Sequence, residues 1–414
     1  MHKISIPKGA KAIILGLRYE NHEAYIVGGC VRDSLLGKEP KDWDICTSAT
    51  PQEVKEYLNR CSVRTIDTGL KHGTITADME RAGKYEITTF RIDGDYSDNR
   101  RPDSVTFTES IYQDLSRRDF TINAMAYNDD PFHGVDDLKN GIIRCVGNPN
   151  DRFSEDALRI LRALRFASVY GFSIEKNTAQ AIHDNAWRLT NIAAERIHSE
   201  LCKLLLGNGV LPVLLDYPDV IATIIPEMKP CIGFDQNNKY HQYTIYDHIA
   251  HAVANYTGKD IAVKVALLLH DIGKPCCYTE DENGGHFHGH GNYSYDISKV
   301  VLERLRFDTT TKQEVLDLAD YIGSTSGIIN YATESDNEEF IICTESGVGY
   351  ELRTKNPNKK FYFAGTKHFC PNMKLNTVEK VCHVLKTGEN EVHVSDETRL
   401  KSLVPLDKML EMAK

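Results

Sequence analysis

Short runs of apolar residues separated by turn residues characterise positions 1–140. The run at 24–27 (AYIV) ends at a Gly-Gly pair, and polar and apolar residues alternate over 84–92 (KYEITTFRI). Both patterns predict strands. The polar stretch 94–102 (GDYSDNRRP), with Gly and Pro at its ends, predicts a mobile loop. We therefore expect a mixed α/β domain over 1–140.

The spacing of apolar residues changes to a helical period after about position 150. Apolar residues three and four apart follow Ser154, with acidic residues in the first turn, which predicts an amphipathic helix with Ser154 as its N-cap. Similar patterns continue to about position 225. The spacing thus predicts an all-helical domain over 141–232.

The residue composition and the spacing of apolar residues change twice more toward the C-terminus. Seven of the sixteen histidines fall between His241 and His290, inside a segment at 233–313 that we expect to be helical. Strand-like runs then appear at 340–343 (FIIC) and 361–364 (FYFA), which predict an α/β fragment over 314–414. The fold class expected for the whole chain is therefore α+β and multidomain.

Composition narrows the class of protein. The chain has 414 residues, 41% hydrophobic and 26% charged, which excludes a collagen, a coiled coil and a wholly disordered chain. We expect neither a secretory signal nor a membrane span, because no apolar run approaches about 20 residues. The formal charge of −10 argues against indiscriminate nucleic-acid coating but permits a local basic groove. Eleven scattered cysteines predict reduced thiols in a cytoplasmic protein.

A glycine pair and a pair of acids give the first candidate site. Gly28 and Gly29 follow the first predicted strand, and backbone without side chains can approach a phosphate closely. Asp42 and Asp44 flank one residue, so an extended strand would place both carboxylates on one face. Two convergent carboxylates suit Mg²⁺, which can activate an attacking hydroxyl and stabilise departing pyrophosphate. The alternative is a chance Asp-X-Asp in an acidic loop.

Five motifs in order carry a family resemblance: GGCVRD at 28–33, KDWDI at 41–45, ITTFR at 87–91, RRDFTINAMA at 117–126 and EDALRILRALRFA at 155–167. Over about residues 10–310 the chain resembles the class II tRNA nucleotidyltransferase and bacterial poly(A) polymerase family. The resemblance implies that Asp42 and Asp44 hold the catalytic metals, with Glu86 as a third carboxylate. It further implies a set of nucleotide-binding residues, namely Gly28, Gly29 and Arg32 at the triphosphate and Arg118 and Asp119 around the nucleotide. For Asp119 the alternative is a buried structural pair with Arg118.

The last of these motifs carries candidate base-selecting residues. Asp156 and Arg159 are three apart on the predicted helix and so adjacent on its surface, and Arg162 extends the row. A carboxylate accepts from an exocyclic amine and a guanidinium donates to a ring nitrogen, which matches cytosine and adenine but not uracil or guanine. A surface ion pair is the alternative. The matching family motif EDxxR implies the selecting role.

The implied reaction is addition of CMP and AMP (the CCA sequence) to tRNA 3′ ends from CTP and ATP, with release of pyrophosphate, Mg²⁺ as cofactor and no nucleic-acid template. A poly(A) polymerase or an A-adding enzyme of the same family is the nearest alternative. Basic residues after position 160 are candidates for contact with tRNA phosphates, although a solvated face would look the same: Arg162, Arg165, Lys176, Arg188, Arg196 and Lys203.

The histidine-rich segment resembles the HD phosphohydrolase domain found in some members of this family, through LLLHDIGKP at 267–275 and GHFHGH at 285–290. His248, His270, Asp271 and His290 are candidate ligands for a second divalent metal, since imidazole and carboxylate groups bind such ions. A metal there could activate water for phosphoester hydrolysis. The alternative is a structural, truncated HD-like tail that helps to hold tRNA.

The C-terminal segment 314–414 resembles the last third of quinolinate synthase, through ADYIGSTSGIINYA at 319–332, FIICTESGVGYEL at 340–352 and KHFCPNMKLNTVEKV at 367–381. Cys370 stands where that family places one ligand of a [4Fe–4S] cluster. One thiolate cannot hold a cluster that needs three protein cysteines, so we expect neither a cluster nor quinolinate synthesis from this chain alone. A small buried residue is the alternative reading of Cys370. We interpret the chain as a fusion or chimera.

Overall fold

The computed structural model describes residues 4–80, 82–94, 96, 102–237, 242–282, 284–317, 325–342 and 348–363. The chain divides into two compact units, Met1–Asp336 and Asn337–Lys414, which are described separately. Most of the predicted loop at 94–102 lies outside the described residues, and so does Cys370.

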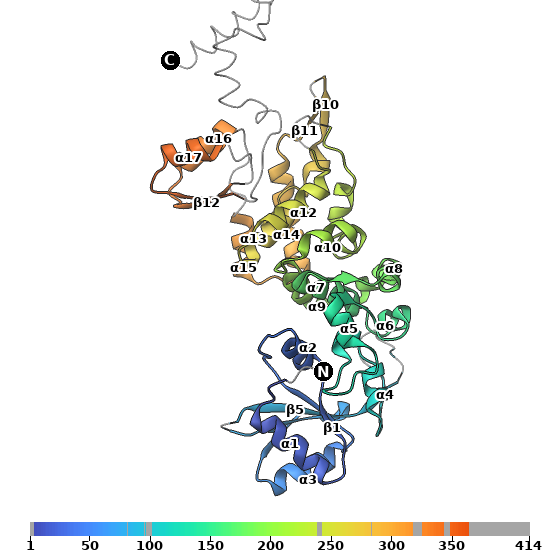
Figure 1. Ribbon diagram of the computed structural model, residues 1–414. Coiled ribbons are helices and arrows are strands. Elements are labelled where there is room, and N and C mark those ends of the chain that lie inside the picture. Colours follow the sequence, from blue (N-terminus) through green and yellow to red (C-terminus); the bar gives the residue numbers. More distant parts are fainter. Residues whose placement is uncertain are drawn as a thin grey trace, which may run out of the picture. The chain divides into compact units, whose positions relative to one another are not determined.

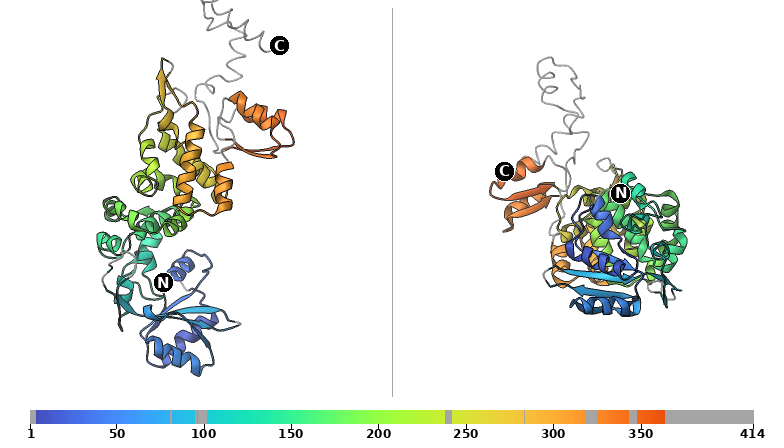
Figure 2. Two further views of the ribbon diagram at one scale, coloured as in Figure 1. Left: turned by 180° about the vertical axis from the view of Figure 1, so that it is seen from behind. Right: turned by 60° about the horizontal axis from the view of Figure 1, so that its bottom comes forward.

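A five-stranded sheet forms the head of the first unit (Figure 1). Its strands, in spatial order, are β1 (Ala24–Ile26), β2 (Asp44–Thr47), β5 (Lys84–Thr89), β4 (Thr74–Asp78) and β3 (Arg64–Gly69). β2 and β5 run parallel, and the other neighbours are antiparallel. Helices α1 (Lys8–Tyr19) and α3 (Pro51–Arg60) cover one face, and α2 (Gly29–Leu35) lies on the other (Figures 1 and 2).

The single strand predicted at 84–92 is two strands in the structure, and each belongs to a different sheet. β5 ends at Thr89, and β6 (Arg91–Asp93) pairs instead with β7 (Val105–Phe107). Phe90 causes the change of partner: its amide donates to the Thr47 carbonyl at 2.7 Å, and its own carbonyl accepts from the Thr108 amide at 3.0 Å. The Phe90 side chain is fully buried in the core between the sheet and the segment that follows it.

The segment after β7 leads from the head into a helical region. It contains α4 (Ile111–Ser116), η2 (Thr121–Asn123), α5 (Gly134–Asn140) and the short parallel pair β8 (Ile142–Ile143) and β9 (Ser173–Ile174). The helices that follow are α6 (Pro149–Glu155), α7 (Leu158–Tyr170), α8 (Lys176–Asn185), η3 (Ala186–Asn191), α9 (Ala194–Leu205), α10 (Val210–Asp216), α11 (Pro218–Ile224) and η4 (Pro226–Cys231). The region is mainly helical, but the strands β8 and β9 lie within 141–232, so the prediction of an all-helical domain is wrong in that respect.

The helix predicted to begin at Ser154 is instead two helices, and its predicted N-cap is wrong. α6 already contains Ser154, whose hydroxyl donates back to the Asp151 carbonyl at 2.8 Å. The chain turns at Asp156, with φ −138° and ψ 101°. The Asp156 carboxylate then accepts from the Leu158 amide at 3.0 Å, which caps the first turn of α7. The apolar spacing begins only at Ala157, so it does not reveal the separate short helix α6, in which Phe153 is the buried residue.

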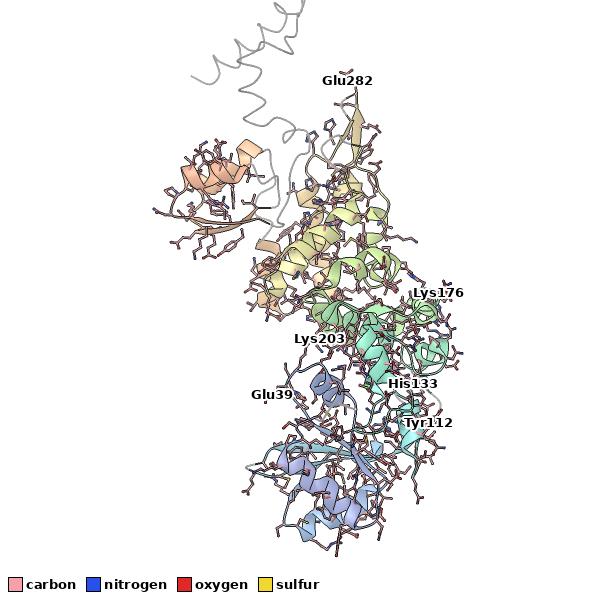
Figure 3. All side chains as sticks on the ribbon, viewed as in Figure 1. Glu39, Tyr112, His133, Lys176, Lys203 and Glu282 are labelled. Carbon is pink, nitrogen blue, oxygen red and sulfur yellow. The ribbon has the colours of Figure 1, made fainter. Side chains whose placement is uncertain are left out.

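The histidine-rich segment is helical with one hairpin. Its elements are α12 (Ile245–Asn255), α13 (Ile261–Leu269), η5 (Lys274–Cys277), the hairpin β10 (Thr279–Asp281) and β11 (Gly284–His286), and α14 (His290–Arg304). Helices α15 (Thr309–Asp317) and α16 (Thr325–Glu334) follow and still belong to the first unit, which ends at Asp336 rather than at the predicted position 313. Glu282 projects from the tip of the hairpin (Figure 3). The Lys264 side chain is buried and donates at 2.6 Å to the carbonyls of Val253 and Tyr256, so it caps the end of α12.

The second unit contains a parallel strand pair joined by a helix: β12 (Glu339–Ile342), α17 (Val348–Lys355) and β13 (Lys360–Phe363). This agrees with the predicted α/β fragment, and the α+β multidomain class is confirmed for the chain. Within the described ranges, no helix is both long enough and apolar enough to cross a membrane.

Candidate active site

A cavity of about 570 Å³ lies in the first unit. In the described part of the chain its walls combine seven arginines with three aspartates and two glycines, drawn from the head and from the helical region. The lining residues are Gly28, Gly29, Arg32, Asp44, Arg117, Arg118, Asp119, Asn123, Asp156, Leu158, Arg159, Arg162, Arg165, Phe166 and Arg196. The excess of guanidinium groups suits a polyanion such as a triphosphate. All the residues predicted to bind nucleotide meet here.

Gly28 is required at the mouth of α2 by both conformation and space. Its φ is +76°, a region that side chains with a Cβ rarely adopt, and its amide donates to the Met125 carbonyl at 2.9 Å. A Cβ at this position would lie 2.7 Å from Nη1 of Arg118. The glycine therefore lets the Arg118 guanidinium approach the backbone at the cavity wall.

The three predicted carboxylates surround the start of β2. Asp44 begins the strand and is the register partner of Glu86 on parallel β5. Asp42 is exposed and lies before the strand, so the prediction that Asp42 and Asp44 share one strand face stays a prediction. Burial raises the pKa of Asp44, Arg118 lowers it, and the charges of Glu86 and Asp42 raise it further. This concentration of negative charge fits a bound divalent cation.

Arg32 is enclosed on several sides. Its Nη2 lies 2.8 Å from Oδ1 of Asp33, and its Nη1 donates to the Asn123 side-chain oxygen. The guanidinium carbon also stands 5.1 Å from the ring centroid of Phe166 and 5.2 Å from that of Tyr170. Arg32 therefore presents a fixed positive charge to the cavity.

Arg118 and Asp119 each have another partner, so the alternative of a buried Arg118–Asp119 pair is wrong. Arg118 lies 3.2 Å from Oδ2 of Asp114, which is fully buried at the end of α4. Asp119 lies 2.6 Å from Nη2 of Arg162. Burial opposes ionisation of Asp119, but the Arg162 charge and a hydrogen bond from Asn123 lower its pKa to about 2. Asp119 thus links the motif to α7.

Asp156 and Arg159 do not form the surface ion pair that their spacing allows. Asp156 lies 2.9 Å from Nη2 of Arg196 on α9, whereas Arg159 lies 2.6 Å from Oε2 of Glu155. Both face the cavity. They also line a second cavity of about 320 Å³, together with His72, Arg91, Asp93, Tyr96, Pro102 and Arg117. The predicted base-selecting pair therefore stands between two cavities.

Some cavity residues carry roles that the sequence did not assign. Arg165 and Arg196 were expected at tRNA phosphates, yet both line the cavity, and Arg165 pairs with buried Glu200 at 3.1 Å. Asn123 and Phe166 stand inside quoted motifs, so their place in those motifs was the available signal. Nothing local marks Arg196, because its partner is forty residues away.

A second constellation is centred on Asp271 of the histidine-rich segment. One ligand atom from each of His248, His270 and Asp271 lies within 4.8 Å of the others, and this is the metal-type group of three found within the described ranges. His248 Nε2 and His270 Nε2 lie 3.4 and 3.3 Å from Oδ2 of Asp271. His290 faces the other oxygen, Oδ1, at 3.3 Å, so it lies outside that compact group.

The donor chemistry of this cluster fits a divalent metal. The Nδ1 atoms of His270 and His290 lie 2.8 Å from the carbonyls of Leu267 and Phe287, which leaves each Nε2 directed at Asp271. Lys274 approaches Oδ2 of Asp271 at 2.7 Å. Burial opposes ionisation, but His270 and Lys274 hold the pKa of Asp271 well below its usual range. The carboxylate is therefore charged and able to act as a ligand.

Family models match four segments of the chain. They are the poly A polymerase head domain at 24–144, the probable RNA and SrmB-binding site of polymerase A at 171–230, the HD domain at 241–342 and the quinolinate synthetase A protein at 305–411. Both predicted resemblances are thereby confirmed. The nucleotidyltransferase and HD models imply use of a divalent metal.

Curated relatives match about half of the chain. The chain is 49% identical over 217 residues to the CCA-adding enzyme of Ligilactobacillus salivarius, covering 51% of this chain and 52% of that protein. It is 51% identical over 206 residues to the CCA-adding enzyme of Lactiplantibacillus plantarum, covering 49% of each. The chain thus spans about half the length of these curated relatives.

Solved structures match a larger share of the chain. The Bacillus stearothermophilus CCA-adding enzyme, solved in complex with CTP, is 31% identical with a TM-score of 0.55, covering 78% of this chain and 74% of that one. The Thermotoga maritima CCA-adding enzyme, solved with tRNA, shares the fold at 22% identity and a TM-score of 0.54, covering 95% of this chain and 86% of that one. The motifs, the cavity and these relatives together show that the chain belongs to the CCA-adding enzyme family.

Proposed function

We propose that the chain is a template-independent tRNA nucleotidyltransferase that adds CMP and AMP to tRNA 3′ ends from CTP and ATP and releases pyrophosphate. The observation that carries the proposal is one cavity lined both by Gly28 and Asp44 of the head and by Asp156 and Arg159 of the helical region. Phosphate-binding and base-selecting groups thereby face a single nucleotide-sized space.

Base selection follows from hydrogen-bond polarity. The Asp156 carboxylate accepts from the exocyclic amine of cytosine or adenine, and the Arg159 guanidinium donates to the adjacent ring nitrogen. Uracil presents a carbonyl in place of the amine, which would leave a carboxylate facing an acceptor. The ion pairs to Arg196 and Glu155 hold the two selecting groups in place. Neither a nucleic-acid template nor base pairing is required.

The triphosphate lies along the arginine-lined wall, where Arg32 and Arg118 contact its oxygens beside Gly28 and Gly29. Asp42, Asp44 and Glu86 would hold Mg²⁺, which would supply electrostatic stabilisation of the attacking oxygen and of departing pyrophosphate. The protein's share of catalysis is then positioning: the fixed arginines and the selecting pair align the α-phosphate with the terminal hydroxyl of tRNA.

Incorporation with separate nucleotides tests this proposal. The full chain is incubated with Mg²⁺ and tRNA that ends at its discriminator base, with labelled CTP, labelled ATP or both. We expect two C residues followed by A, and loss of incorporation in Asp44→Ala. Addition of A without CTP would favour the alternative of a poly(A) polymerase or A-adding enzyme. Absence of incorporation by folded protein would overturn the proposal.

We infer a second candidate function for the histidine-rich segment, a divalent-metal site with phosphohydrolase chemistry. The buried Asp271 with imidazole nitrogens on both of its oxygens supports it. A metal there would supply an activated water, and Lys274 would offer a positive charge to a phosphate oxygen. Hydrolysis of a generic phosphodiester substrate with added Mn²⁺ or Ni²⁺, compared with His270→Ala, tests this function. Equal rates in both proteins would refute it.

A further inference from the structure

Tyr170, the last residue of α7, reaches back to the head. Its hydroxyl donates to Oδ1 of Asp33 on α2 at 3.0 Å, which joins two residues 137 positions apart in sequence. Burial raises the pKa of Tyr170 to about 12, so the hydroxyl keeps its proton at neutral pH and stays a donor. This bond connects the helix that carries Arg159 with the helix that carries Arg32.

The oxygen that accepts from Tyr170 also holds Arg32. Oδ1 of Asp33 accepts from Nε of Arg32 at 2.9 Å and lies 2.8 Å from its Nη2. The same tyrosine ring stands 5.2 Å from the Arg32 guanidinium carbon and 4.5 Å from the Lys38 ammonium. Tyr170 therefore constrains Arg32 twice, by a hydrogen bond through Asp33 and directly by a cation–π contact.

Arg32 lines the cavity, whereas the two residues that hold it in place do not. Among the described residues, the cavity wall includes Arg32 but neither Asp33 nor Tyr170. Asn123 and Phe166 hold the remaining sides of the guanidinium, and both line the cavity themselves. Removing the tyrosine hydroxyl would therefore loosen the Asp33 carboxylate that holds Arg32, without removing any group that lines the cavity.

We propose that Tyr170 is a positioning residue, which through Asp33 fixes the Arg32 guanidinium against the triphosphate of the incoming nucleotide. The inference rests on the proposed function, because it assigns Arg32 to the phosphate end of the nucleotide. Arg32 belongs to α2 of the head, whereas Arg159 of the base-selecting pair belongs to α7. The Tyr170–Asp33 bond thus keeps the phosphate end and the base end of the site in register.

Binding of two probes tests the proposal on the full chain. Dissociation constants for CTP and for inorganic triphosphate, both with Mg²⁺, are measured by calorimetry for the wild type, Tyr170→Phe, Asp33→Asn and the double variant. Tyr170→Phe keeps the ring over Arg32 and removes only the hydroxyl. Tyr112→Phe, at an exposed tyrosine outside the cavity wall (Figure 3), is the matched control. Thermal midpoints of all variants establish that they are folded.

We expect Tyr170→Phe to weaken the binding of CTP and of inorganic triphosphate by the same factor, roughly five- to tenfold, the size expected for the loss of one hydrogen bond. In turnover, the CTP KM should rise by that factor while kcat stays close to wild type. The double variant should bind no more weakly than the weaker single variant, because both changes break one linkage.

Two results would overturn the inference while the proposed function stands: unchanged binding of both probes by Tyr170→Phe, or weaker binding of CTP alone. A fall in thermal midpoint with unchanged affinity would also overturn it, since that result assigns Tyr170 to packing. If the wild type bound neither probe, the proposed function would fail, and the inference would fail with it.

Discussion

The Asp156 carboxylate pairs with Arg196 on α9, 2.9 Å away, rather than with Arg159 three positions along the chain. This relationship frees Arg159 to take Glu155 as its partner at 2.6 Å. Each selecting group then has a separate support, and neither neutralises the other. Acceptor and donor can therefore both be offered to a base, which a direct Asp156–Arg159 pair would prevent.

Arg196→Ala should impair base selection more than folding. Without Arg196 the Asp156 carboxylate loses its second anchor, so we expect the preference for CTP over UTP in kcat/KM to fall roughly tenfold. Single-nucleotide incorporation measures the ratio. Arg188→Ala removes a basic residue outside the cavity wall and serves as the control. An unchanged ratio in Arg196→Ala would show that Asp156 needs no such support.

Asp44→Asn should stabilise the fold while abolishing catalysis. The folded protein raises the pKa of Asp44 above the ordinary 3.8, so the charged form is disfavoured in the folded state. The stability that the group contributes is present below pH 3.8 and is lost as the pH rises through the raised pKa. At neutral pH, without metal, a neutral side chain should therefore raise the thermal midpoint, by roughly 1–3 °C.

Scanning calorimetry at pH 7 and at pH 3.5 measures this effect. The gain of Asp44→Asn should shrink at the lower pH, where wild-type Asp44 is largely protonated. Asp42→Asn, at the exposed carboxylate before β2, should change the midpoint little. A lower midpoint for Asp44→Asn at pH 7 would contradict the account of the raised pKa.

Divalent metal should stabilise the histidine-rich segment through His248, His270 and Asp271. An ion bound only by the folded chain raises the thermal midpoint in proportion to the logarithm of its concentration. We expect Mn²⁺ or Ni²⁺ to do so, and a chelator to reverse it. His270→Ala should abolish the shift. His183→Ala should retain it, because His183 belongs to α8 and pairs with Asp219 of α11 instead. Equal shifts in both variants would place the ion elsewhere.

A stop codon after Asp336 should leave CMP incorporation within twofold of the full chain. Every residue of the cavity belongs to the first unit, Met1–Asp336. The second unit carries the quinolinate-synthase-like segment and supplies none of the described cavity residues. A steady-state assay with tRNA measures the ratio. Loss of activity with an unchanged thermal midpoint would show that the second unit takes part in the reaction.

Sequence reasoning located the site because its groups lie in contiguous motifs. Gly28, Asp44 and Asp156 are fixed by their neighbours along the chain, and the structure brings them to one cavity. The motifs did not reveal which residues form ion pairs with one another. Arg118 and Asp119 are adjacent in sequence, yet each pairs with a residue of another element, because side chains of successive residues point in different directions.

The helix break at Asp156 shows a second limit. The apolar spacing belongs to α7, and the acidic residues before it predict the first turn of that same helix rather than a separate helix. At the break the Asp156 carboxylate accepts from the Leu158 amide and pairs with Arg196, and this second partner, forty residues away, has no local signature. The same long-range pairing explains why the sequence did not predict that Arg196 lines the cavity.

The measurement that tests the central claim most directly is incorporation into tRNA lacking its CCA end, with Mg²⁺ and with CTP and ATP supplied singly and together. The account predicts two C residues from CTP alone, a following A only when CTP is also present, and no product from Asp44→Ala or from UTP and GTP. Folded wild-type protein that binds CTP yet adds no nucleotide would contradict it.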